Sequence, residues 1–200
     1  QKQRGRDLLI GDRWIADFAS LNYLGLDQDE HVIASVEPMI RRWGSHPSWT
    51  RAVASPEPYA TLERELALLV GAPDVVVFPT ITLLHLGVLP LLARTGTIFI
   101  DQGSHRSMLE AAELAQARGA RVVHVRRSDA ADLDAKLRKA DPQLPRIVLV
   151  NGVYSMPGTL PDLPAYASVV AEHGATLYID DAHGFGVLGP QGRGTAAHFG

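Results

Sequence analysis

The sequence of 200 residues has no cysteine, which excludes a disulfide scaffold, a thiolate metal site and a cysteine nucleophile. It also lacks an excess of positive charge, because 19 Lys and Arg stand against 22 Asp and Glu. This balance disfavours nucleic-acid binding. No apolar run reaches the ~18 residues of a membrane span, and a hydrophobic fraction of 46% is too high for a disordered chain. We expect a globular protein, and the absence of cysteine fits the reducing cytoplasm.

The chain starts at Gln1 without the charged and then apolar segment of a secretory signal, so we expect it to be a piece of a longer protein. In its first part, short apolar runs at 7–10 and 14–18 flank a Gly-Asp pair in the manner of a hairpin, and helical spacing follows at 31–43 and 59–70. We expect an arm over residues 1–70 and part of an α/β domain over residues 71–200.

Beyond residue 74, short runs rich in valine and isoleucine alternate with stretches of helical spacing. Such alternation predicts parallel βαβ units with right-handed crossovers and a sheet covered by helices on both faces. The predicted strands are 75–78, 97–100, 121–125, 147–150 and 176–179. The predicted helices between them are 80–93, 105–118, 129–140 and 164–173.

Ligands gather at the carboxyl ends of parallel strands, so the residues that follow each predicted strand are candidates for chemistry. Thr80, Ile81 and Thr82 stand where a helix begins, and amides and hydroxyls there are suited to holding a phosphate. A plain helix cap at Thr80 is the alternative. His105 follows the second strand, where it is either a functional imidazole or a capping side chain. Ser155 lies in the polar segment after the fourth strand, for which a plain turn is the alternative.

The segment Asp180-Asp181-Ala182-His183-Gly184 places two carboxylates and an imidazole at the end of the fifth predicted strand. A buried carboxylate is costly unless it meets a cation or several hydrogen-bond donors. Three other readings remain open: helix capping, a metal site formed by Asp180, His183 and His105, and a solvent-exposed acidic turn. The following 184–189 segment matches GxGxxG, but Pro190 and further glycines oppose the helix that a dinucleotide site requires.

Several segments, taken together, resemble the α-oxoamine synthase family of fold type I pyridoxal-phosphate (PLP) enzymes. They are Asn22-Tyr23-Leu24-Gly25-Leu26, Leu62-Glu63-Arg64-Glu65-Leu66-Ala67, the turn 101–107, Gly152-Val153-Tyr154-Ser155-Met156 and Asp180-Asp181-Ala182-His183-Gly184. The resemblance extends over about residues 14–194, and its most specific part is the last of these segments with its glycine-rich sequel.

The resemblance implies a role for each of these residues. Asp180 would bind the protonated pyridine nitrogen of PLP, and His105 would stack on the cofactor ring. Ser155 and His183 would hydrogen-bond near the phenolic oxygen. The turn 80–82, which comprises Thr80, Ile81 and Thr82, would hold the phosphate.

Some positions depart from the family pattern, and they lie where the family contacts substrate. Ile81 replaces a glycine, His85 an asparagine and Asn151 a glutamate, while His46-Pro47-Ser48-Trp49 replaces a glycine-rich loop. We expect Asn22, His46 and Asn151 to contact the substrate, and Trp49 either to narrow the pocket or to serve packing.

A PLP enzyme also needs a lysine to bind the cofactor. The chain contains only Lys2, Lys136 and Lys139, which lie in the first residues and in a charged helix. In the family this lysine comes after the segment that corresponds to Asp180-Asp181-Ala182-His183-Gly184. We therefore expect it beyond Gly200, in an enzyme about twice as long.

The implied reaction is the decarboxylative condensation of an amino acid with an acyl thioester, carried by coenzyme A or a carrier protein, in a cytoplasmic homodimer. Three alternatives remain. An aminotransferase would use the same Asp180 and His105, a metal-dependent hydrolase would use Asp180, His183 and His105, and an inactive α/β interaction module would use none of them.

Overall fold

The computed structural model describes residues 2–46 and 50–200. The chain forms two compact units, Gln1–Val75 and Val76–Gly200, which are described separately below. Residues 47–49 of the early polar loop, including Trp49, lie outside the described residues, so the expectation for Trp49 stays untested.

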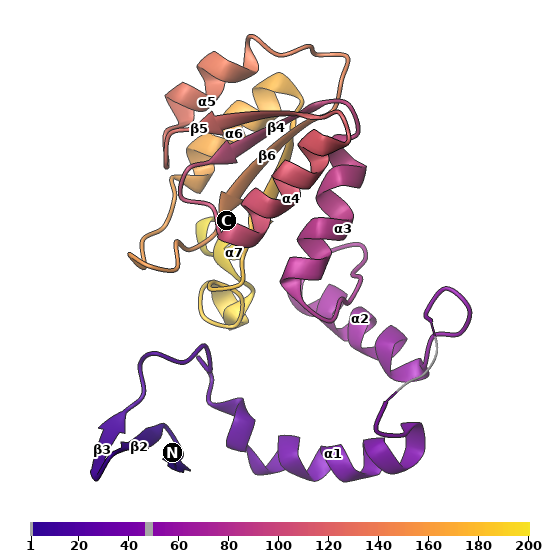
Figure 1. Ribbon diagram of the computed structural model, residues 1–200, viewed down its shortest axis with the longest axis vertical. Coiled ribbons are helices and arrows are strands. Elements are labelled where there is room, and N and C mark those ends of the chain that lie inside the picture. The colour runs from indigo at the N-terminus through magenta and orange to yellow at the C-terminus, as the bar shows by residue number, and fades with distance from the viewer. Residues whose placement is uncertain (1, 47–49) are drawn as a thin grey trace. The chain divides into compact units, whose positions relative to one another are not determined.

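The second unit is built on a parallel sheet of four strands in the order β5-β4-β6-β7. Figure 1 labels β5, β4 and β6 of this sheet. In chain order the strands are β4 (Thr97–Asp101), β5 (Arg121–Val125), β6 (Arg146–Asn151) and β7 (Thr176–Asp180). In the register of the two last strands, Asn151 pairs with Asp180. The carboxyl ends of β6 and β7 therefore lie side by side and present their last side chains at one edge of the sheet.

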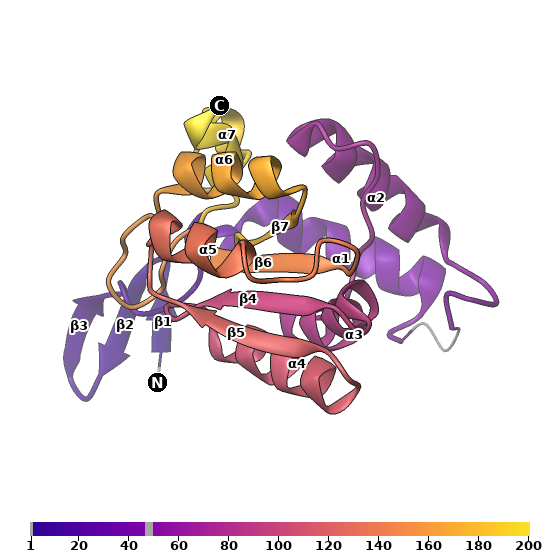
Figure 2. The same ribbon diagram turned by 90° about the horizontal axis from the view of Figure 1, so that it is seen from above.

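Helices cover both faces of this sheet, as the sequence predicts (Figure 2). The helices are α3 (Ile81–Ala93), α4 (Arg106–Ala117), α5 (Ala130–Leu137), α6 (Leu163–His173) and the short α7 (Thr195–Phe199), with a 3-10 turn η2 (Pro190–Gly192) before α7. Helices α3 and α4 pack on one face, and α5 and α6 on the other. The segment that matches GxGxxG forms turns and opens no long helix.

Successive side chains of a strand point to opposite faces of the sheet, so a hydrophobic core forms on each face. On β4, Ile98 and Ile100 point to the face covered by α3 and α4, whereas Phe99 points to the face covered by α5 and α6. All three are at most 1% exposed. Each such side chain contributes roughly 1.5–3 kcal/mol when fully buried. The helices are also fixed at their starts, because Thr80 and Asp162 accept a hydrogen bond from a first-turn amide of α3 and α6, respectively.

The first unit contains a three-stranded antiparallel sheet and two helices. Its elements are β1 (Lys2–Arg4), β2 (Asp7–Ile10), β3 (Arg13–Ala16), the 3-10 turn η1 (Leu26–Gln28), α1 (Glu30–Trp43) and α2 (Glu57–Val70). The predicted hairpin is confirmed as β2 and β3. Strand β1 was not predicted, because its three residues are all polar and carry no alternation.

All six predicted helices are present, with ends shifted by at most three residues. The strand predicted at residues 75–78 is wrong. Residues 75–78 have no regular secondary structure, and Val76 and Phe78 are 62% and 37% exposed. A strand needs a neighbour to pair with as well as apolar side chains, and a run of four apolar residues specifies only the second requirement.

No helix in the described part of the chain is both long enough and apolar enough to cross a membrane.

Candidate active site

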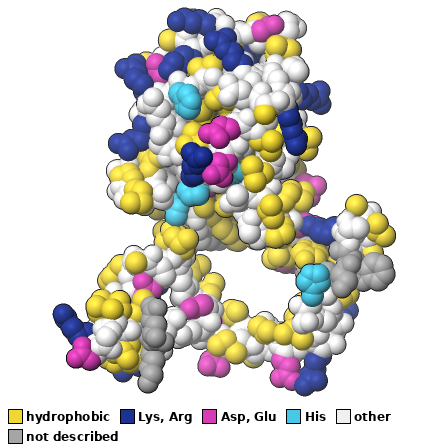
Figure 3. All heavy atoms as spheres, in the orientation of Figure 1, with side chains coloured by type: hydrophobic (Ala, Val, Ile, Leu, Met, Phe, Trp, Pro, Cys, Tyr) yellow, Lys and Arg dark blue, Asp and Glu magenta, His cyan; other side chains and the backbone are white. Residues whose placement is uncertain are grey.

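The polar residues of the candidate site stand at the carboxyl ends of the central strands. Asp101, Asn151 and Asp180 are the last residues of β4, β6 and β7, and they are only 1–3% exposed. Three polar side chains buried at one edge of a sheet require partners. The face of the second unit drawn in Figure 3 also carries acidic, basic and histidine side chains near its middle.

His105 connects α4 to the end of β6. Its backbone N–H donates to Asn151 Oδ1 at 3.0 Å, and its Nδ1 caps α4 by accepting from the Ser107 N–H at 3.3 Å. Its side chain stays exposed at the same edge. The capping reading of His105 is therefore correct, and it leaves the other ring nitrogen and the ring faces available to a ligand.

Asp180 is buried at 3% exposure and receives a hydrogen bond from the Ala182 N–H to Oδ1 at 3.1 Å. Among the described residues it forms no ion pair with a lysine or an arginine. The imidazole of His85 faces it, with Nε2 at 3.9 Å from Oδ2. A single backbone donor compensates only part of the cost of burying a charge. The carboxylate is thus suited to a cationic group supplied by a ligand.

His85 is a further site residue, which the sequence indicates only as a departure from the family pattern near substrate. It is fully buried on α3, and its Nδ1 lies 3.0 Å from the Ser107 hydroxyl. Burial lowers the pKa of His85, an effect that Asp180 opposes and His105 reinforces. A neutral imidazole therefore faces the Asp180 carboxylate. The family pattern supplies this signal, because a single histidine within an apolar helix alone more often marks a core residue than a site residue.

The second carboxylate of the motif, Asp181, has a structural role. It accepts hydrogen bonds from both the backbone N–H and the hydroxyl of Thr195. A Cβ added to Gly152, Gly184 or Gly194 would lie within 2.2 Å of its oxygens. The glycines therefore make room for Asp181, which fastens the glycine-rich loop to α7.

The predicted phosphate turn opens α3. Thr80 caps the helix, because its hydroxyl accepts from the Leu83 N–H at 3.2 Å, and Ile81 is 40% exposed. The first amides of an α-helix have no partner within the helix, so those of Ile81 and Thr82 suit an anion. The capping reading and the phosphate reading are compatible here.

The remaining predicted residues are more dispersed. Ser155 is exposed in the turn after β6, and His183 is half-buried in the turn after β7. Asn22 and His46 belong to the first unit. The Asn22 side-chain amide donates to Asp27 at 2.5 Å, and His46 is exposed. The structure therefore brings together Asp180, Asn151 and His105, and it adds His85 and Ser107.

The alternative metal site receives no support, because no group of three or more acidic or histidine side chains in the described ranges 2–46 and 50–200 is arranged to hold a metal ion.

The lysines of the second unit lie beside β5, the outermost strand on the side of the sheet away from β7. Lys136 and Lys139 line a small hollow together with Thr97 and Arg121, which are the first residues of β4 and β5. Lys136 donates to Asp132 and to the His124 carbonyl. Neither amine is placed to reach a ligand held by Asp180.

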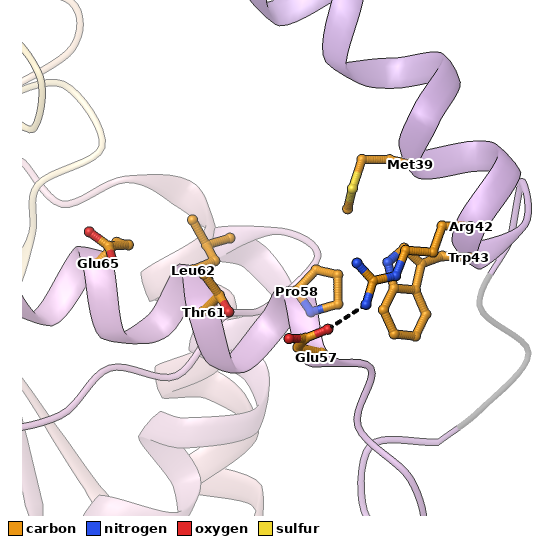
Figure 4. Close-up of a pocket in the computed structure, with 8 residues that line it drawn as sticks. All are labelled: Met39, Arg42, Trp43, Glu57, Pro58, Thr61, Leu62 and Glu65. Carbon is orange, nitrogen blue, oxygen red and sulfur yellow. Dashed lines mark hydrogen bonds and ion pairs between the residues drawn. The ribbon is translucent and has the colours of Figure 1, made fainter.

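A hollow in the first unit is lined by α1 and α2 (Figure 4). Its lining residues are Met39, Arg42, Trp43, Glu57, Pro58, Thr61, Leu62 and Glu65. Arg42 and Glu57 form an ion pair at 2.8 Å beside it. None of the predicted site residues lines this hollow.

Comparison with known proteins places the chain among enzymes of similar architecture. It is 38% identical over its whole length to 8-amino-7-oxononanoate synthase of Cellvibrio japonicus, and 33% identical over 99% of its length to serine palmitoyltransferase of Bacteroides ovatus. Among solved structures, serine palmitoyltransferase of S. paucimobilis with a bound PLP–myriocin aldimine matches with a TM-score of 0.92 and 27% identity over the whole chain.

The chain spans about half the length of these relatives. The expected α/β fold and the resemblance to 8-amino-7-oxononanoate synthase and serine palmitoyltransferase are confirmed. The sequence model described as aminotransferase class I and II matches residues 15–199, and the chain therefore belongs to that family.

Proposed function

We propose that this chain is part of a PLP-dependent enzyme that condenses an amino acid with an acyl thioester and releases carbon dioxide. The observation that carries the proposal is the buried Asp180 at the end of β7, which has one backbone donor and no lysine or arginine partner among the described residues. The relatives named above, 8-amino-7-oxononanoate synthase and serine palmitoyltransferase, support the reaction type.

PLP, when bound, supplies an electron sink for the carbanion that forms on the amino acid. Asp180 holds the protonated ring nitrogen and keeps it charged, which explains why its burial is tolerated. His105 is fixed by Asn151 and Ser107, so its ring is positioned to stack on the cofactor. The start of α3 at Thr80, together with the Ile81 and Thr82 amides, holds the phosphate.

The roles of the dispersed residues belong to the same proposal. Ser155 and His183 hydrogen-bond near the phenolic oxygen, and Asn22, His46 and Asn151 contact substrate. Asn151 is buried and uncharged at the position where the family pattern has a glutamate. This difference favours a substrate different from that of the family.

At the scale of the protein, residues 71–200 form part of the PLP-binding domain, and the protein acts as a homodimer in the cytoplasm. The homodimer is implied by the family resemblance. Large exposed apolar side chains on α1, which are Val32, Ile33, Val36, Met39 and Ile40, are compatible with burial against a partner.

An aminotransferase is the second candidate, because the matching family model carries that description and because Asp180 and His105 would serve either reaction.

The test is the absorbance spectrum of the full natural chain with added PLP. We expect an imine band that borohydride removes, and peptide mapping should then place the reduced cofactor on a lysine outside residues 1–200. Asp180→Asn should weaken PLP binding at least about tenfold, because the amide does not keep the ring nitrogen protonated. Asp141→Asn, at an exposed position, serves as the control. Absence of the imine band in the unsubstituted protein would refute the proposal.

A further inference from the structure

The direction of three hydrogen bonds fixes the proton on His85. The Ser107 backbone N–H donates to His105 Nδ1, so this nitrogen carries no proton. The Ser107 hydroxyl, 2.8 Å from the same nitrogen, must then donate to it as well. A hydroxyl has one hydrogen, so at its 3.0 Å contact with His85 Nδ1 the Ser107 oxygen accepts. His85 therefore carries its proton on Nδ1.

The consequence is an unprotonated nitrogen beside a carboxylate. Neutral His85 with its proton on Nδ1 has only a lone pair on Nε2, which is buried without a hydrogen-bond partner and lies 3.9 Å from Asp180 Oδ2. Two acceptors that face each other do not form a hydrogen bond, which agrees with a separation well beyond 3.2 Å. The opposite tautomer would place an N–H donor against Asp180.

We propose that His85 is a positioning residue for Asp180. Ser107 keeps the His85 proton on Nδ1, so that His85 Nε2 has no hydrogen to donate to the Asp180 carboxylate. The inference rests on the proposed function, in which Asp180 binds the cofactor ring nitrogen. Asp180 Oδ2 then keeps its full charge for that cation. The Ser107 hydroxyl also contacts His105, so one hydroxyl positions both the residue that would stack on the cofactor ring and the residue that faces Asp180.

The arrangement has a defined dependence on pH. The titratable groups that face the His85 ring are Asp180 and Tyr178 on β7 and His105 at the start of α4. Burial lowers the pKa of His85, so the imidazole is neutral at neutral pH and becomes charged only in acid. A charged His85 would donate from Nε2 to Asp180 and compete with the cofactor. We expect PLP affinity to fall in acid below the His85 pKa, and to fall less steeply in His85→Asn.

The first test is made on the full natural chain with cofactor removed and histidine labelled with nitrogen-15. Long-range proton–nitrogen correlation reports which ring nitrogen is protonated, and His85→Asn identifies the signals of His85. We expect a protonated Nδ1 and an unprotonated Nε2. A protonated Nε2 at neutral pH would overturn the inference, whatever the variants do.

The second test measures PLP affinity in Ser107→Ala, which leaves both histidines in place. Without the hydroxyl, the His85 proton is free to move to Nε2, and we expect PLP to bind about tenfold more weakly because Asp180 would share its charge with an internal donor. His124→Asn, at an exposed position on β5, is the matched control and should bind as the unsubstituted protein does. Equal affinity of Ser107→Ala and the unsubstituted protein would overturn this inference alone. Failure of the unsubstituted protein to bind PLP would overturn the proposed function and this inference with it.

Discussion

Three aspartates lie near the carboxyl ends of the strands, and they differ in the hydrogen bonds that their carboxylates accept. They are Asp101, Asp180 and Asp181. Asp101 accepts from the Gly103 and Ser128 backbone N–H groups and from the Tyr166 hydroxyl, at 2.7–2.8 Å. Asp181 is bound by Thr195, whereas Asp180 has one backbone donor. A carboxylate with several internal donors stabilises the fold, and one with few is available to a ligand.

The three hydrogen bonds that the Asp101 carboxylate accepts lead to a prediction on stability. Asp101→Asn should lower the free energy of unfolding by roughly 2–4 kcal/mol, because the new amide group turns a donor toward buried donors. Tyr166→Phe, which removes one of the three bonds, should cost only about 1–2 kcal/mol. Urea unfolding of the variants measures both values.

The matched control for this prediction is Asp141→Asn. Asp141 is exposed and accepts from the Gln143 N–H in a turn that asparagine also forms, so its change should stay within about 0.5 kcal/mol. Equal losses in Asp101→Asn and Asp141→Asn would show that the Asp101 bonds contribute nothing to stability.

The sequence predicts some of these residues for physical reasons and misses others. Asp180 is predictable because a carboxylate directly after a buried strand requires a cation or several hydrogen-bond donors. The contact of His85 with Asp180 is not predictable, since it depends on how α3 is rotated against β7, which no spacing within α3 specifies. The difference between Asp180 and Asp181 likewise depends on Thr195, which is distant in sequence from both.

At the scale of elements, the glycine-rich loop after β7 illustrates how small residues position a charged one. Gly184 lies where a Cβ would stand 2.1 Å from Asp181 Oδ1 and 2.2 Å from the Thr195 hydroxyl. The loop can close over Asp181 only where side chains are absent. This packing explains why a GxGxxG spacing occurs here without a dinucleotide site.

Gly184→Ala should therefore be strongly destabilising, by at least about 2 kcal/mol, because the methyl group must displace a hydrogen-bonded pair. Gly87→Ala in α3 is the matched control. A Cβ at Gly87 meets nothing within 4 Å, so alanine should raise the helix stability by up to about 1 kcal/mol. Thermal unfolding distinguishes the two variants by opposite shifts of Tm. A shift of the same sign in both would contradict the packing argument.

A helix or strand is predictable from the sequence where its own residues show the pattern of apolar side chains that it buries. The alternation of apolar runs and helical spacing predicts β4 to β7 and the helices on both faces, because each of these elements buries one pattern of side chains. Residues 75–78 carry the pattern of a buried strand without forming one, and β1 forms without the pattern, by pairing with β2. Pairing is a property of two segments, which a single run does not contain.

At the scale of the whole molecule, the candidate site contains groups proposed to bind PLP but no lysine that could bind it covalently. Lys136 and Lys139 lie beside β5, the outermost strand on one side of the sheet, whereas Asp180 and Asn151 lie at the carboxyl ends of β7 and β6 on the other side. The chain also spans about half the length of its relatives. Both facts support the expectation that the cofactor lysine is supplied from outside these 200 residues.

The choice between condensation and transamination gives the last prediction. Ile81, His85 and Asn151 depart from the family pattern at positions expected near substrate, while the groups proposed to hold the cofactor fit their roles. Such departures change what is bound sooner than they change the chemistry of the cofactor. We therefore expect condensation with an unusual substrate pair.

The measurement uses the full natural chain, labelled amino acids and a panel of acyl thioesters, and it follows carbon dioxide and free thiol together. Condensation releases one carbon dioxide and one thiol for each amino acid consumed, so the two should appear in equal amounts and only when both substrates are present. An aminotransferase would instead convert the cofactor to its pyridoxamine form with an amino donor alone, and it would release neither product. That outcome would replace the condensation reaction while leaving the proposed contacts of Asp180 and His105 with the cofactor unchanged, because both reactions require a charged ring nitrogen and a ring held in place.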